Sequence, residues 1–157
     1  SGQLPQKYIP IPNLSIKVPV GRGFFVFSRG DKHLTNAFQQ QIVTRPFMNP
    51  PPYTITYTGN LFSGPLTVQV FNNDEGGEGD GFNLLGNPYA APIRWGSLGK
   101  ENVGPNVWVF DPLNNRYKVS NDPETVIPAG AGFFVRVNPG FKTGAVHFQE
   151  QAKVLPQ

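Results

Sequence analysis

The chain has 157 residues, a net charge of +3 and an unusual supply of side chains, with 13 Phe, 18 Gly and 17 Pro but only 15% charged residues. It contains no cysteine, which excludes thiol catalysis, cysteine-ligated zinc and iron–sulfur clusters. No basic run is longer than one residue, and no apolar run approaches the roughly 20 residues of a membrane helix. The sequence therefore argues against a nucleic-acid partner and against membrane insertion.

The first part of the chain is punctuated by proline. Residues 1–18 are expected to form an extended, Pro-rich lead-in, because proline is tolerated at sheet edges and not in sheet interiors. Residues 19–157 are expected to form a single β-sandwich domain. Its first predicted strand is Phe24–Phe27, and the polar segment 32–41 fits either a short helix or a loop. The prolines at 50–52 then predict a stiff connector.

The rest of the chain alternates short apolar or β-branched runs with Gly, Pro and Asn turn signals, which is typical of strands. The predicted strands cover residues 54–58, 66–70, 82–85, 107–110, 116–119, 133–137 and 145–148. The runs 107–110 and 116–119 are separated by Asp-Pro and Asn-Asn and are expected to pair as a hairpin. Many short strands without a long helix predict an all-β fold, a jelly-roll-like antiparallel β-sandwich.

One short sequence occurs twice. Residues 19–26 read PVGRGFFV and residues 128–135 read PAGAGFFV, so six of the eight positions are identical. Each copy is a Pro/Gly turn that leads into an aromatic run, the pattern of a glycine-flanked strand after a tight turn. A duplicated scaffold motif favours an architectural or binding module over an enzyme.

Three further segments carry a family resemblance: GFNLLGNPYAAPIRWGSL at 81–98, NVWVFDPLNNRY at 106–117 and IPAGAGFFVRV at 127–137. Together with the first GFFV copy they resemble the GNPY/GFFV-type β repeat module of large surface and secreted proteins of Bacteroidota. The resemblance covers roughly 19–154. It implies a non-catalytic structural or adhesion module of a larger extracellular or cell-surface protein, neighbouring modules as partners, and export by type IX secretion. It supplies no catalytic residues.

An acidic, glycine-rich loop is the candidate metal site. Asp74, Glu75, Glu78 and Asp80 lie within seven positions of the segment 72–81. Calcium takes six to eight oxygen ligands, and glycine lets a loop wrap around an ion. The alternative is a solvated loop kept soluble by its charge. Calcium is therefore a possible cofactor of this loop.

Aromatic residues in or beside turns are candidates for sugar stacking, because exposed rings offer flat apolar faces. Tyr89, Trp95 and Tyr117 fit this description, whereas Trp108 is flanked by residues expected in the core. The alternative for each ring is packing in or at the rim of the core. A carbohydrate-binding module is the second functional hypothesis, with a glycan or another surface ligand as partner.

Catalysis is poorly supported. The two histidines, His33 and His147, lie outside any recognisable nucleophile motif, so we expect no enzyme activity. The tripeptide Arg29-Gly30-Asp31 is expected to be a local turn and not an integrin ligand. An internal isopeptide crosslink is conceivable at Lys17, Lys118 or Lys153, and no spacing singles one out. The most supported function is a non-catalytic structural or adhesion module.

Overall fold

The protein is described by a computed structural model, in which residues 11, 13, 15–25, 59–73, 80–111, 114 and 116–154 are described. The chain divides into two compact units, residues 1–24 with 61–157, and residues 25–60. All strands described below belong to the first unit. The predicted strand at 54–58 and the segment 32–41 lie outside the described residues, and a single domain over 19–157 stays a prediction.

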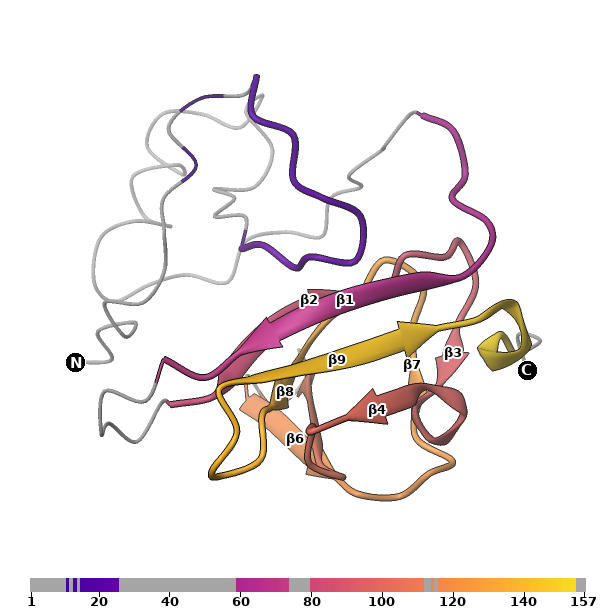
Figure 1. Cartoon of the computed structure of the whole chain (residues 1–157). Helices are drawn as coiled ribbons and strands as arrows, with labels where there is room; N and C mark the ends of the chain where they lie inside the picture. Colours follow the sequence, from indigo (N-terminus) through magenta and orange to yellow (C-terminus); the bar gives the residue numbers. More distant parts are fainter. Residues whose placement is uncertain are drawn as a thin grey trace, which may run out of the picture. The chain divides into compact units, whose positions relative to one another are not determined.

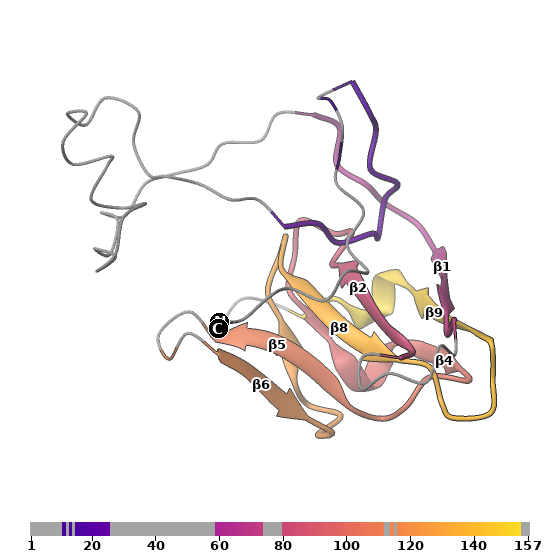
Figure 2. The ribbon, with the colours of Figure 1, turned by 90° about the vertical axis from the view of Figure 1, so that its left-hand side faces the viewer.

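Two antiparallel sheets form the two layers of the first unit (Figure 1, Figure 2). The smaller sheet has the order β1–β9–β4, made of β1 Leu66–Phe71, β9 Thr143–Phe148 and β4 Gly99–Glu101. The larger sheet has the order β2–β8–β5–β6, made of β2 Phe82–Gly86, β8 Gly132–Arg136, β5 Val107–Asp111 and β6 Arg116–Ser120. The described residues contain no α-helix, so the prediction of an all-β, sandwich-like fold is confirmed.

Shorter elements close the ends of the sandwich. A two-stranded sheet pairs β3 Ile93–Arg94 with β7 Val126–Ile127. The 3-10 turns η1 Trp95–Ser97 and η2 Glu150–Ala152 follow β3 and β9. The short strands β3, β4 and β7 were not predicted, because two or three residues are too few to show a period.

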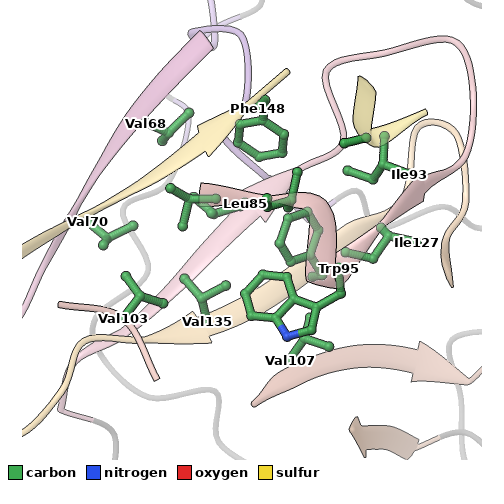
Figure 3. Close-up of a cluster of buried hydrophobic side chains, with 14 of the residues drawn as sticks. Val68, Val70, Leu85, Ile93, Trp95, Val103, Val107, Ile127, Val135 and Phe148 are labelled. Carbon is green, nitrogen blue, oxygen red and sulfur yellow. The ribbon is translucent and has the colours of Figure 1, made fainter. Parts of the chain in front are cut away.

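The core fills the space between the two layers. Alternation places Val68 and Val70 of β1 inside, and their neighbours Thr67 and Gln69 outside. Figure 3 shows side chains of both sheets, such as Val68, Leu85 and Val135, filling this space together with Trp95. The ring centroid of the fully buried Phe133 lies 6.3 Å from that of Trp95 and 6.4 Å from that of Phe148. The smaller sheet thus contacts the larger one through edge-to-face aromatic packing.

The duplicated sequence makes the same turn twice. Gly21 and Gly130 hold corresponding positions and both have a positive φ, 81° and 67°. In each copy an amide donates back to a proline carbonyl three residues earlier, from Arg22 to Pro19 at 3.1 Å and from Ala131 to Pro128 at 3.2 Å. Only glycine adopts this left-handed conformation without steric cost, which explains why the motif repeats its glycine.

The two turns lie on either side of the Gly86-Asn87 segment. The Gly86 amide donates to the Gly21 carbonyl at 2.9 Å, and the Asn87 amide donates to the Ala131 carbonyl at 3.0 Å. The copies differ after the turn. The second copy becomes the central strand β8, whereas Arg22 forms an isolated bridge with Leu85. The predicted strand Phe24–Phe27 is therefore wrong over Phe24 and Phe25, its described part.

Candidate functional site

The outer face of the larger sheet, turned away from the core, carries a row of aromatic side chains. In β5, Val107 points into the core and Val109 packs against it, so alternation turns Trp108 and Phe110 outward. The register places Trp108 opposite Phe134 of β8, and Phe110 opposite Tyr117 of β6. We call this surface the outer aromatic face, defined by Phe82, Trp108, Phe110, Tyr117, Val119 and Phe134.

The rings of the outer aromatic face pack edge to face. The centroids of Phe82 and Trp108 are 4.7 Å apart with the planes at 72°, and those of Tyr117 and Phe134 are 5.3 Å apart at 77°. Phe110 and Tyr117 follow at 5.4 Å and 62°. Such tilted pairs are favourable for the rings themselves and produce an uneven surface, not a row of parallel ring faces.

Exposure increases towards the β5–β6 hairpin. Phe110 is 45% exposed, Tyr117 39% and Val119 51%, while Trp108 and Phe134 are half-buried. Partial burial raises the pKa of the Tyr117 phenol above its ordinary value, so the hydroxyl is neutral at physiological pH. At the other end Arg136 lies over the Phe82 ring at 5.2 Å and donates from Nε to the Asp80 carbonyl at 3.0 Å.

The opposite side of the same hairpin borders an open groove of about 520 Å³. Its lining mixes apolar and polar residues from β5, β6, the turn after β6 and the start of β7: Val109, Phe110, Asp111, Lys118, Ser120, Asp122, Thr125 and Val126. The Ser120 and Thr125 hydroxyls share a hydrogen bond of 2.7 Å. The Asp122 carboxylate accepts from the Glu124 amide at 2.9 Å. The hairpin thus presents an aromatic side and a mixed groove side, and Phe110 borders both.

Two of the three rings predicted for sugar stacking are in the core. Tyr89 is 2% exposed and donates from its hydroxyl to the Gly64 carbonyl at 2.8 Å. Trp95 is 1% exposed and donates from Nε1 to the Pro105 carbonyl at 2.7 Å. Neither ring can present a face to a ligand, and both satisfy their polar atoms internally. Of the three, Tyr117 alone lies on an accessible surface.

The structure describes one of the four predicted calcium ligands. Asp74, Glu75 and Glu78 lie outside the described residues. Asp80 is buried at the start of the turn into β2, where its carbonyl accepts the Arg136 hydrogen bond. Among the described residues no group of three or more His, Asp or Glu side chains is placed to hold a metal. Calcium binding by this loop stays a prediction.

The remaining candidates have ordinary surroundings where they are described. His147 shares a hydrogen bond of 2.9 Å between its Nδ1 and the Thr67 hydroxyl, across β9 and β1. Lys153 forms an ion pair with Glu150, while Lys17 and Lys118 are exposed. His33 and the Arg29-Gly30-Asp31 tripeptide lie outside the described residues. Within the described part of the chain, no helix is long and apolar enough to cross a membrane.

Sequence reasoning missed the outer aromatic face. Trp108 was set aside as a ligand-binding ring because the residues that flank it were expected in the core, but strict alternation in Val107–Phe110 puts it on the other side of the sheet. The same alternation separates Phe133 from Phe134 within the GFFV motif. The two-residue period of each strand could have revealed this face. In a paired strand the side on which a residue lies is decided by its position in that period, and not by the hydrophobicity of its sequence neighbours.

Comparison with known proteins finds no match: no family model matches the sequence, no curated protein matches it, and no solved structure matches the fold.

Proposed function

We propose that this chain is a non-catalytic structural or adhesion module of a larger cell-surface or secreted bacterial protein, and that it contacts a neighbouring protein module through the outer aromatic face. The observation that carries the proposal is the exposure of Phe110, Tyr117 and Val119 on a sheet whose other face already forms the core. Contiguous exposed apolar surface is typical of protein contact sites. Aromatic residues are enriched at such sites.

The geometry of the rings favours a protein partner over a sugar. A pyranose stacks on a ring whose face is open to solvent. Here Phe110 and Tyr117 meet at 62°, and the face of Phe82 is covered by the Arg136 guanidinium. An uneven apolar surface is complementary to side chains that interdigitate, as they do in protein interfaces.

The resemblance to the Bacteroidota repeat module supports the same proposal. The two halves of the resembling sequence are joined physically, because Asn87 of GNPY donates from its side chain to the carbonyls of Ile127 and Pro128 at 3.4 and 3.0 Å. A motif pair that ties the segment after β2 to the end of β7 is scaffold, consistent with a module whose role is structural. The proposal includes export by type IX secretion and an extracellular or cell-surface location.

A carbohydrate-binding module is the second candidate, favoured by the accessible Tyr117 ring. The informative substitution is Tyr117→Ala, because Tyr89 and Trp95 are core residues whose replacement would destabilise the fold whatever the ligand. Retention of the wild type on an insoluble polysaccharide, lost in Tyr117→Ala, would favour this candidate over the protein-contact module.

Hydroxyl-radical footprinting tests the proposal. Phe110 and Phe141 are similarly exposed, at 45% and 48%, but Phe141 lies in the turn between β8 and β9. Labelling of both side chains is measured in the isolated chain and in the intact parent protein. We expect Phe110 and Tyr117 to lose most of their labelling in the parent while Phe141 keeps its own. Equal labelling of Phe110 in both states would refute the proposal.

A further inference from the structure

The larger sheet ends at β6 with an edge that no described strand covers. At its other end β2 is already bonded, since the Gly23 amide donates to the Leu84 carbonyl at 3.1 Å. Figure 2 shows β6 at the outer margin of the sheet, beside β5. Four of its five residues are exposed, and Ser120 is half-buried. An edge strand offers a row of backbone donors and acceptors to another strand.

The side chains of β6 divide between two surfaces. Tyr117 and Val119 belong to the outer aromatic face, whereas Lys118 and Ser120 line the groove on the other side. A strand added at this edge alternates in the same way, because directly paired residues point to the same face. Apolar residues of the added strand would lie beside Tyr117 and Val119, and an acidic residue would lie opposite Lys118.

Charge and the length of the strand argue against a second copy of this chain as that strand. Antiparallel pairing of β6 with itself about a two-fold axis places one residue opposite its own copy. All five residues pair only when that residue is Lys118, which opposes two ammonium groups. Pairing centred on Tyr117 puts Arg116 opposite Lys118. Pairing centred on Val119 lets only residues 118–120 of β6 pair with the same residues of the second copy. Like charges directly opposite are destabilising.

We propose that the β6 edge accepts an extended segment of a partner protein in which acidic residues alternate with apolar ones. The segment continues the sheet β2–β8–β5–β6 by one strand, with its apolar side chains prolonging the outer aromatic face. This inference rests on the proposed function, since it names the form in which the neighbouring protein binds. Backbone hydrogen bonds supply affinity in this mode, and alternate side chains supply specificity.

The test measures binding of fluorescently labelled peptides to the full chain by fluorescence anisotropy. Both peptides are as long as β6. In one, valine alternates with glutamate, and in the other valine alternates with lysine. We expect the wild type to bind the glutamate peptide, and Lys118→Glu to weaken that binding about tenfold, because a cross-strand attraction becomes a repulsion. The lysine peptide should bind Lys118→Glu better than it binds the wild type. Lys142→Glu is the matched control, since Lys142 is exposed outside every strand and the change in net charge is the same.

Three results would overturn the inference. The first is no binding of the glutamate peptide, and the second is an equal loss of its affinity in Lys118→Glu and Lys142→Glu. The third is sedimentation that shows a wild-type dimer whose dissociation constant is changed by Lys118→Glu. Circular dichroism of each variant establishes that it is folded. If the peptides fail while footprinting still shows Phe110 protected in the parent protein, strand addition is wrong and the protein-contact module stands. If Phe110 is unprotected, the proposed function itself fails.

Discussion

Replacing Asn87 by aspartate should destabilise the protein far more than its small change in shape suggests. Asn87 is buried, and its side-chain amide donates to the carbonyls of Ala91 at 2.9 Å, Pro128 at 3.0 Å and Ile127 at 3.4 Å. Its Oδ1 accepts from the Tyr89 amide at 3.0 Å. Aspartate keeps the acceptor oxygen and loses both donor hydrogens. The hydrogen bonds to the Ala91 and Pro128 carbonyls therefore disappear, and these carbonyl oxygens face a carboxylate oxygen instead.

The magnitude follows from those two bonds. A buried polar group left without its partner costs about 1–3 kcal/mol, so Asn87→Asp should lose about 4 kcal/mol of unfolding free energy. For a chain of this size that corresponds to a fall in Tm of about 12 °C. The pKa of the new carboxyl should be raised by burial and by the facing carbonyls, so the native state holds its proton to higher pH than the unfolded chain. The loss should therefore be larger at pH 7 than at pH 4.

Thermal melts of wild type, Asn87→Asp and the exposed control Asn73→Asp, at both pH values, test this reasoning. The control makes the same change in charge and should shift Tm by no more than a degree or two, roughly the effect of a surface substitution. Equal shifts in the two variants, or an Asn87→Asp loss that is larger at pH 4, would refute the role of Asn87 as a buried donor.

Substitutions at three other places probe separate contacts. Glu150 accepts from Lys153 and from the Gly64 amide, which lower the pKa of its carboxyl below the ordinary 4.5, so its contribution is present above about pH 4.5 and lost as the pH falls further. The Tm difference between wild type and Glu150→Gln should accordingly shrink in melts run from pH 7 down to pH 3. Gly96→Ala would bring a Cβ to 2.5 Å from the Pro123 Cβ and should cost about 1–3 kcal/mol in urea unfolding, with Ser97→Ala as control. Phe133→Ala should cost about 3–5 kcal/mol and Phe134→Ala clearly less, and equal losses would contradict the two-sided strand.

Strand positions were predictable wherever a run was long enough to show its period. The hairpin of β5 and β6 and the strands β1, β2, β8 and β9 follow directly from alternation and turn residues. The first GFFV copy was misjudged over Phe24 and Phe25, because an identical local sequence does not specify strand pairing. What the two copies share is the turn, which depends on glycine at positive φ and not on tertiary contacts.

The candidate surface was harder to predict than the fold. Turn proximity suggested that Tyr89 and Trp95 are exposed, yet both rings are buried in the core, and each donates its polar hydrogen to a backbone carbonyl. Conversely Phe110, surrounded by apolar residues, is exposed because the larger sheet has one face turned away from the core. Which face of a sheet is covered depends on layer packing, which the pattern of a single strand does not contain.

Site-specific photocrosslinking shows whether the outer aromatic face contacts another protein. A photoreactive amino acid replaces Val119 on that face, or Phe141 away from it, in the larger protein of which we propose this chain to be a module. We expect a crosslink to a polypeptide from position 119 and none from position 141. A probe at position 119 that captures no polypeptide, or captures as much as the probe at position 141, would contradict it.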